Sequence, residues 1–464
     1  MRVAEGRGRF ARTIVPMRSQ FETLKSQAQA ARKASRTLAA SSTDTRNGAL
    51  IALAASLEER KSEVLAANKR DLSAAKISGL DEHIVERLSL NAQRIADIAQ
   101  SVRDVALLPD PVGEVIEYRL LPNGLRLERR RVPLGVIGVI YESRPNVTVD
   151  IAALCLKSGN ACILRGGKEA FETNSKLAQI ARQAISGSGL PAGAVQFVAS
   201  TDRALVGDML QMKGEIDLMI PRGGAELVRM VAREAKMPAI TGGVGVCHTY
   251  VDAAADLANA LSIVHNAKTS RPTVCNALDT VIVHSAVAER FLPMLAQAFA
   301  ASGVEMRCDR RSLSVLGALP FPFKGEGEAN KGKRVRKSTS AAVGAPVIKL
   351  AAPGDFGQEF LSLVASIAVV DSLDDALDFI ARHGSGHSEA IVTEDIAAAE
   401  RFLNEVDAAA VFANASTRFN DGGEFALGAE VAISTNKFHA RGPMGLREIT
   451  SYKWVIRGDG QIRK

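Results

Sequence analysis

The sequence lacks the features that mark a disulfide scaffold or a membrane protein. Its 464 residues include five cysteines, an odd number without a CxxC pair, which suits a reducing compartment better than a disulfide framework. We therefore expect a cytoplasmic protein. No apolar run reaches the roughly 18 to 20 residues that cross a bilayer, which excludes a transmembrane segment. The cysteines are Cys155, Cys162, Cys247, Cys275 and Cys308.

Several catalytic motifs are absent as well. The chain has no Gly-rich loop ending in Lys-Ser/Thr and no GxSxG elbow, which argues against ATP hydrolysis and against a serine hydrolase. His383 and His387 are four residues apart, as zinc ligands on a helix would be, but glycines lie between them and no third ligand pattern appears. We therefore expect no bound metal.

The chain has little net positive charge outside two short segments. The formal net charge is +7, yet residues 1–20 and 319–340 each carry a net +4, so the rest of the chain is close to neutral. We expect residues 1–20 to be a disordered basic extension and the insert at 321–340 to be a surface loop, because neither can pack a core. A nucleic-acid-binding protein would interleave aromatic stacking platforms with these basic residues, and the cluster at 331–337 has none. We therefore expect no nucleic-acid partner.

The order of apolar segments predicts an α/β fold. Residues 21–106 have helical spacing, and 114–121 and 125–132 flank Asn123-Gly124, a pair suited to a tight hairpin turn. Short apolar strands then alternate with amphipathic helices in two successive blocks, which implies two doubly wound parallel lobes with a cleft between them. The strand-like tail at 449–462 is expected to pair with the hairpin, in the same chain or in another subunit.

Two glycine turns follow strands of the first block. Gly223 and Gly224 stand between a strand and a helix, where main-chain N–H groups can approach an anion. Such a turn has a structural explanation at least as often as a ligand. The same alternatives hold for the turn at 165–168, where Lys168 either reaches a ribose or phosphate or is only solvated.

Cys275 is the cysteine best placed for chemistry. It lies in a polar, helix-breaking stretch at 266–276, at the junction of the two blocks, with Lys268 and Arg271 before it. Nearby cations favour a thiolate, so we expect the pKa of this thiol to lie below its usual value of about 8.5. For the other cysteines, Cys247 beside a histidine included, a structural role is the simpler interpretation.

Five segments carry longer motifs: VPLGVIGVIYESRPNVT at 132–148, PRGG at 221–224, TSRPTVCN at 269–276, NASTRF at 414–419 and HARGPMGL at 439–446. Together they closely resemble the γ-glutamyl phosphate reductases, a family within the aldehyde dehydrogenase superfamily, over most of the chain apart from the insert. The resemblance implies an NADPH-dependent reduction of L-glutamyl 5-phosphate to L-glutamate 5-semialdehyde and phosphate, in proline biosynthesis.

The resemblance also implies a domain organisation. The fold would be aldehyde-dehydrogenase-like, with two doubly wound α/β lobes and a small β ribbon for oligomerisation. A cofactor-binding domain is expected at 21–113 and 134–265, a catalytic domain at 266–440, and the ribbon at 114–133 and 441–464. We expect a homo-oligomer. A glutamate 5-kinase is a candidate partner, and the sequence leaves open whether it passes on the unstable acyl phosphate directly.

The resemblance assigns catalytic roles to two residues. Cys275 matches the family's nucleophile, whose thiolate would attack the acyl phosphate and form a thioester. Asn146 matches the superfamily's oxyanion-hole asparagine and would stabilise the tetrahedral oxyanion together with the N–H of Cys275. Many aldehyde-oxidising relatives have a glutamate where this chain has Thr241. Because Thr241 cannot activate water, the thioester is expected to be reduced rather than hydrolysed.

Binding residues follow from the same matches. Lys168, Gly223 and Gly224 match the adenosine-ribose and pyrophosphate neighbourhoods, and Glu359 matches the glutamate that holds the nicotinamide ribose. A solvated surface acid is the alternative interpretation of Glu359.

The doubly anionic substrate requires cations. Arginines bind carboxylate and phosphate groups through two parallel hydrogen bonds, and structural salt bridges are the competing explanation for each one. The expected substrate ligands are Arg144, Arg271 and Arg418.

A thiol-dependent dehydrogenase of another aldehyde or acyl phosphate is the alternative function.

Overall fold

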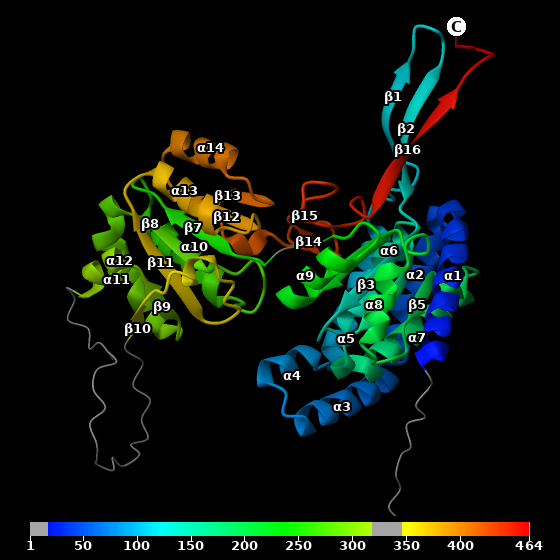
Figure 1. Ribbon diagram of the computed structural model, residues 1–464, viewed down its shortest axis with the longest axis horizontal. Helices are drawn as coiled ribbons and strands as arrows, with labels where there is room; N and C mark the ends of the chain where they lie inside the picture. The colour runs from blue at the N-terminus through cyan, green and yellow to red at the C-terminus, as the bar shows by residue number, and fades with distance from the viewer. Residues whose placement is uncertain (1–16, 241, 243, 318–345, 464) are drawn as a thin grey trace, which may run out of the picture. The chain divides into compact units, whose positions relative to one another are not determined.

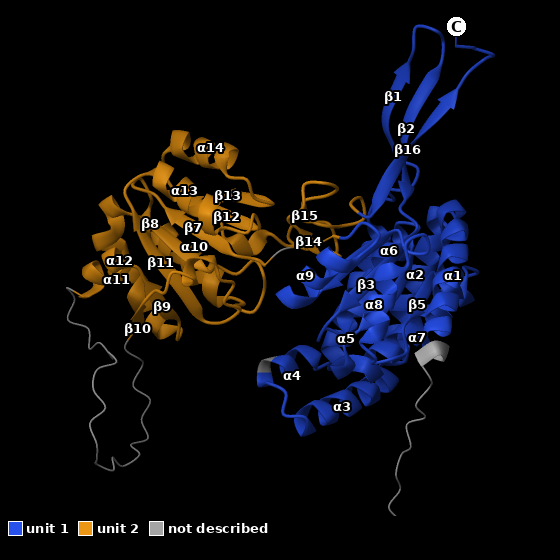
Figure 2. Ribbon diagram, in the orientation of Figure 1, with its two compact units in different colours: residues 1–239, 449–464 blue, residues 240–448 orange. Residues whose placement is uncertain are grey.

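The computed structural model describes residues 17–240, 242, 244–317 and 346–463. The chain divides into two compact units (Figure 2), unit 1 from residues 1–239 and 449–464, and unit 2 from residues 240–448. The described residues leave out positions 1–16 of the expected basic extension. They also leave out the whole of the expected insert at 321–340. Within the described ranges, no helix is long and apolar enough to cross a membrane.

Unit 1 is built on a four-stranded parallel sheet (Figure 1), in the order β5 (Val195–Phe197), β4 (Ala161–Gly166), β3 (Val136–Tyr141) and β6 (Leu218–Arg222). Every residue of β3 is buried, as a central strand of a covered parallel sheet requires. The helices are α1 (Met17–Ala40), α2 (Thr43–Glu59), α3 (Lys61–Ile77), α4 (Glu82–Leu88), α5 (Ala92–Leu107), α6 (Asn146–Lys157), α7 (Phe171–Gly187), α8 (Ala204–Gln211) and α9 (Ala225–Glu234).

The first helices form for local reasons that the sequence contains. In α2, Leu50, Leu53 and Leu57 recur at helical spacing and are fully buried. The N-terminus of α5 is capped by Asn91, whose side-chain oxygen accepts a hydrogen bond from the N–H of Arg94 at 2.8 Å. Capping and one apolar face together account for the predicted helical lead-in.

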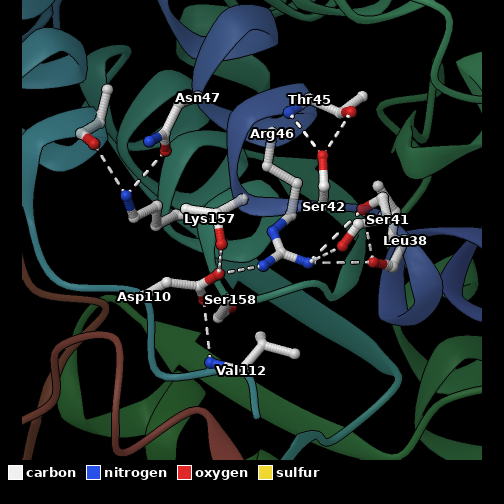
Figure 3. A network of polar contacts seen from close by, with 12 residues as sticks. Leu38, Ser41, Ser42, Thr45, Arg46, Asn47, Asp110, Val112, Lys157 and Ser158 are labelled. Carbon is white, nitrogen blue, oxygen red and sulfur yellow. Dashed lines mark hydrogen bonds and ion pairs between the residues drawn. The ribbon is translucent and has the colours of Figure 1, made fainter. Parts of the chain in front are cut away.

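A buried polar network joins the helices of unit 1 (Figure 3). The fully buried Arg46 of α2 pairs with Asp110, and Thr43 donates to the same carboxylate at 2.5 Å. Lys157, at the end of α6, donates to the side chain of Asn47 at 2.7 Å and to the main-chain oxygen of Ala106 at 2.8 Å. These charges are buried but hydrogen-bonded, which is the condition for tolerating them in a core.

A three-stranded antiparallel ribbon completes unit 1 and extends beyond its helices (Figure 2). Its strands are β1 (Val115–Leu120), β2 (Arg126–Pro133) and β16 (Thr450–Arg457), with β2 in the middle. Gly124 has φ +85°, as the predicted tight turn requires. The tail pairs with the hairpin within the same chain.

Unit 2 contains a seven-stranded parallel sheet in the order β10 (Val347–Leu350), β9 (Glu305–Cys308), β11 (Val364–Val370), β8 (Thr280–His284), β7 (Cys247–Val251), β12 (Ser388–Val392) and β13 (Ala410–Ala413). Its helices are α10 (Leu257–Thr269), α11 (Ser285–Ala301), α12 (Arg310–Gly317), α13 (Leu373–His383) and α14 (Ile396–Glu405), and a short pair, β14 (Ile433–Ser434) and β15 (Gly442–Pro443), follows. Alternate residues of β8 pack on opposite faces, with Val281 and Val283 in one cluster with α11, and Ile282 in another with α13 and α14. Both sheets confirm the predicted parallel α/β architecture.

The boundary between the units differs from the expected one. A division near 265 was predicted, but the second unit begins at residue 240. The reason is β7, which pairs with β8 and β12 of the seven-stranded sheet, so the segment from 247 to 265 belongs to unit 2. Similarly, residues 441–448 lie in unit 2 rather than in the ribbon.

Candidate functional site

Cys275 lies in the loop between α10 and β8. The N–H of Leu278 donates to the oxygen of Ala267 at 3.0 Å, and the N–H of Asp279 donates to the oxygen of Cys247 at 3.0 Å. These bonds hold the loop at the edge of the sheet where β7, β8 and β12 begin. The side chain of Cys275 is half-buried, whereas those of the other four cysteines are buried. Cys275 is therefore the thiol with access to a reactant.

The residue after Cys275 is clamped from a distant segment. Asn276 is buried, and its side-chain nitrogen donates to the main-chain oxygens of Asn420 at 3.0 Å and Arg418 at 3.3 Å. The hydroxyl of Thr417 donates to the oxygen of Asn276 at 2.8 Å. The motifs at 269–276 and 414–419 thus form one structural element. The roles of Asn276 and Thr417 were not predicted, because only the tertiary contact between the motifs assigns them.

Two of the expected substrate arginines lie near Cys275. Arg418 is half-buried, and its guanidinium donates to the side-chain oxygens of Asn276 and, at 3.3 Å, of Ser270. Burial lowers the pKa of Arg418, the nearby positive charge of Arg271 acts in the same direction, and Asp421 and Cys275 oppose them. Both arginines are therefore close enough to affect an anion bound beside the thiol. Arg271 is exposed.

Glu359 is partly buried and lies close to the buried carboxyl group of Asp279. Burial raises its pKa to about 7, the charge of Asp279 acts in the same direction, and the hydrogen bond from the N–H of Gly245 opposes them. The interpretation of Glu359 as a fully solvated surface acid is therefore wrong.

Lys268 was expected to flank Cys275, but its charge is directed elsewhere. It is fully buried in the last turn of α10, donates to the oxygen of Leu278 at 2.7 Å and lies 3.8 Å from Asp279 Oδ1. Asp279 also accepts from the N–H groups of Phe360 at 3.0 Å and Cys247 at 3.3 Å. Lys268 thus balances a buried carboxylate beneath the loop. The expectation that Lys268 directly flanks the nucleophile is wrong for this reason.

The remaining expected site residues belong to unit 1. Asn146 is the first residue of α6, and its side-chain nitrogen donates to Asp150 Oδ2 at 2.8 Å. The carbonyl of Arg144 accepts from the N–H of Val147 at 3.2 Å, so both residues lie in the turn that starts α6. Thr241 lies outside the described residues.

The glycine turn at the start of α9 already contacts an anionic side chain. The N–H of Gly224 donates to Glu142 Oε2 at 3.0 Å, and a Cβ at Gly223 would lie 2.5 Å from the same oxygen. A side chain at Gly223 would therefore require the carboxylate of Glu142 to move. The helix N-terminus has the predicted affinity for negative charge, which Glu142 partly satisfies.

A positive group that the sequence did not single out lies three residues before Lys168. Arg165, at the end of β4, is 8% exposed and donates to the main-chain oxygens of Gly166 at 3.1 Å and of Thr201 and Asp202 at 3.3 Å each. Its Nε has no hydrogen-bond partner among the described residues. Lys168 itself is exposed and follows directly after this strand. The carboxyl ends of strands are where α/β sheets bind dinucleotides.

Known proteins are similar to this chain over nearly its full length. Residues 14–318 match the model of the aldehyde dehydrogenase family. A gamma-glutamyl phosphate reductase from Roseiflexus castenholzii is 53% identical over 435 residues, which is 93% of this chain and 97% of the relative. A gamma-glutamyl phosphate reductase from Cronobacter sakazakii is 50% identical over 440 residues, 95% of this chain and 100% of the relative.

The fold has a solved counterpart. The crystal structure of a gamma-glutamyl phosphate reductase from Thermotoga maritima matches with a TM-score of 0.87 and 40% identity, and the match covers 95% of this chain and 100% of that chain. The aldehyde-dehydrogenase-like fold predicted from the motifs is thereby confirmed.

Proposed function

The chain belongs to the aldehyde dehydrogenase family, and on that premise we propose that it reduces L-glutamyl 5-phosphate to L-glutamate 5-semialdehyde and phosphate, a step of proline biosynthesis. The observation that carries the proposal is the half-buried Cys275, fixed through Asn276 and close to the charges of Arg271 and Arg418. The relatives reported above support the same reaction, since each is named for it.

The chain's own residues can perform the acyl transfer. The thiolate of Cys275 attacks the acyl carbon, the C–O bond to phosphate breaks, and a thioester to Sγ remains. Arg271 and Arg418 provide positive charge for the phosphate and carboxylate of the substrate. The main-chain N–H of Cys275 and the amide of Asn146 are the proposed donors to the developing oxyanion. A reduced nicotinamide cofactor, when bound, supplies the hydride that converts the thioester to the aldehyde and restores the thiolate.

Unit 1 has the groups that a dinucleotide needs. The amide-rich N-terminus of α9 and the buried, incompletely satisfied guanidinium of Arg165 both lie at the edge of the sheet where such cofactors bind. Gly223, Gly224 and Lys168 are the proposed contacts there, and Glu359 of unit 2 is the proposed contact to the nicotinamide ribose.

The reaction is tested most directly in reverse. Purified protein is supplied with the semialdehyde, inorganic phosphate and NADP⁺, and the appearance of reduced cofactor is followed by absorbance. We expect turnover that depends on phosphate, and a loss of roughly a thousandfold or more in Cys275→Ser. Cys308→Ser, at a buried thiol in β9 of unit 2, is the control. Turnover without phosphate would favour the alternative of another thiol-dependent aldehyde dehydrogenase, and full activity of Cys275→Ser would exclude the mechanism.

NADPH is the proposed form of the cofactor. Arg165 is buried near the end of β4, Lys168 follows two residues after that strand, and the charge of Arg203 acts on Arg165, so a 2′-phosphate bound at this edge would meet positive charge. We expect Lys168→Ala to weaken NADPH binding about tenfold and NADH binding less than about twofold. Lys213→Ala is the control for removing a lysine elsewhere in unit 1. Equal losses for both cofactors would contradict this assignment.

The ribbon is proposed to mediate self-association. Val115, Tyr118, Leu120, Trp454 and Ile456 are all large apolar side chains of β1 and β16 that are exposed in the single chain. Exposed apolar strands of this kind mark an interface. We expect a homo-oligomer by light scattering and a shift toward monomer in Trp454→Glu. An unchanged mass in that variant would argue against an interface at the ribbon.

Two expectations from the sequence stay predictions. They are the transfer of the acyl phosphate from a glutamate 5-kinase and a cytoplasmic location.

A further inference from the structure

A second cysteine contacts the main chain of the nucleophile. Cys247 is the first residue of β7 and is fully buried. Its Sγ lies 3.2 Å from the carbonyl oxygen of Cys275, 3.4 Å from that of Gly245 and 3.7 Å from Nδ1 of His387. The closest of these three atoms is thus the carbonyl oxygen of Cys275.

The protonation state of Cys247 suits a donor rather than a nucleophile. Burial raises the pKa of this thiol well above its usual value, the nearby acidic groups of Asp279, Glu389 and Cys275 act in the same direction, and a hydrogen bond with the side chain of Ser388 opposes them. A thiol that keeps its proton can donate S–H to a carbonyl oxygen, although it is a weak donor. The same proton makes Cys247 a poor nucleophile.

The chain beside Cys247 also contacts the nucleophile directly. Gly245 packs so closely that a Cβ there would overlap the carbonyl oxygen of Cys275 and lie 2.8 Å from its Cβ. The N–H of Gly245 also donates to the carboxylate of Glu359. The short segment from 245 to 247 therefore connects the proposed nucleophile to the proposed nicotinamide-ribose contact, entirely within unit 2.

We propose that Cys247 is a positioning residue for Cys275, with its buried thiol holding the nucleophile's carbonyl so that Sγ keeps one direction relative to Glu359. This inference rests on the proposed function, because it takes Cys275 as the nucleophile. The chemistry requires such a constraint, since the same Sγ must first attack the acyl carbon and then present the thioester to hydride. A misplacement of about 1 Å at this stage can cost about a hundredfold in rate.

The test compares variants that keep or remove the donor. Cys247→Ser keeps a hydrogen-bond donor, Cys247→Val fills the space without one, and Cys247→Ala is a smaller donor-free variant in case valine prevents folding. Cys308→Val is the matched control, since Cys308 is equally buried in β9 of the same sheet and packs in its apolar core. For each variant we would measure kcat and KM in the reverse reaction, the melting temperature, and the rate at which iodoacetamide alkylates Cys275.

We expect Cys247→Val and Cys247→Ala to lower kcat about tenfold with KM within about twofold, since one neutral hydrogen bond is lost. Cys247→Ser is expected to retain kcat within about threefold, and Cys308→Val to leave kcat unchanged. Normal kcat in Cys247→Val, or an equal loss in Cys247→Ser, would overturn the proposal.

Alkylation separates this inference from the proposed function, because it requires no substrate. If Cys247 positions the thiol, the alkylation rate of Cys275 changes in the valine and alanine variants but not in Cys308→Val, even if the substrate is a different acyl phosphate. An alkylation rate identical to wild type in Cys247→Val and Cys247→Ala would overturn the positioning role whatever the substrate.

Discussion

Glu142 Oε2 accepts a hydrogen bond from the main-chain N–H of Gly224 at 3.0 Å, so the N-terminus of α9 holds a negative charge that belongs to the chain itself. The pyrophosphate of a dinucleotide would be attracted to the same helix N-terminus and repelled by that carboxylate. The two anions therefore compete for one set of N–H groups.

Glu142→Gln is predicted to tighten the binding of NADPH, because it removes the repulsion and weakens the competing hydrogen bond. We expect the dissociation constant, measured by titration calorimetry without substrate, to fall roughly threefold to tenfold at low salt. Glu172→Gln, at a partly exposed glutamate in the first turn of α7 that pairs with Arg70, is the control. Weaker or unchanged binding in Glu142→Gln would show that the pyrophosphate does not approach α9 at Gly224.

Ser143 adopts a strained main-chain conformation that Glu169 stabilises. Its φ is +46°, in the left-handed region that few residues other than glycine occupy. Glu169 Oε1 accepts from its N–H at 2.7 Å and from its hydroxyl at 3.0 Å. The turn leads directly to Arg144 and Asn146, so we infer that Glu169 orients both.

Glu169→Ala is predicted to lower kcat about tenfold while changing the melting temperature little, because the strained turn relaxes without disturbing the core. Glu169→Gln should retain more activity, since its amide oxygen still accepts. Steady-state kinetics and thermal melts of both variants provide the measurement. Wild-type kcat in Glu169→Ala would mean that the turn keeps its geometry without this carboxylate.

The buried pair of Arg46 and Asp110 predicts a large effect on stability. Replacing Arg46 by Met leaves the carboxylate of Asp110 in the core without its cation, which costs about 3 kcal/mol or more. Denaturant unfolding should show this loss, and Arg46→Met combined with Asp110→Asn should recover part of it. Arg103→Met, at the exposed pair with Glu58, should change the unfolding midpoint little. A midpoint unchanged in Arg46→Met would contradict the assignment.

The elements were predictable where their signals are local. The helical spacing within 21–106 indicated helices such as α2, and the short apolar segments that alternate with amphipathic ones indicated parallel strands such as β3. Both signals lie in short stretches of sequence, because burial on one or both faces sets the pattern of apolar residues. Cys275 could be chosen for the same reason, since its loop has a distinctive composition. Local signals therefore selected Cys275 as the candidate nucleophile and predicted the architecture.

The missed features all depend on contacts between distant segments. Nothing near 247 shows that β7 pairs with β12, some 140 positions along the chain, so the unit boundary was misplaced. Lys268 was expected beside Cys275 because the sequence places them close, but the last turn of α10 directs it toward Asp279. The clamp on Asn276 by residues 417–420 likewise appears only when both motifs are folded.

The pKa of His387 indicates how the free energy of unfolding depends on pH. Burial lowers its pKa to about 4, whereas an unfolded histidine titrates near about 6.5. Between these values the unfolded chain binds a proton that the folded chain does not, so stability falls as pH falls, by about 3 kcal/mol over the whole window. Asp279 has the opposite effect. Burial raises its pKa to about 6, so its contribution to stability falls as pH rises from about 4 to 6.

Comparison with His387→Gln isolates the histidine from these opposing carboxylates. Glutamine does not titrate, so the free energy of unfolding of the variant should lack the acid-side loss due to residue 387. At pH 7.5 the variant should be the less stable protein, because a buried site shaped for imidazole is refilled imperfectly. Urea unfolding at a series of pH values should then show the difference narrowing below pH 6.5 and approaching zero or reversing near pH 4.5. Parallel stability curves for the two proteins would mean that His387 takes up its proton in the folded chain as readily as in the unfolded one.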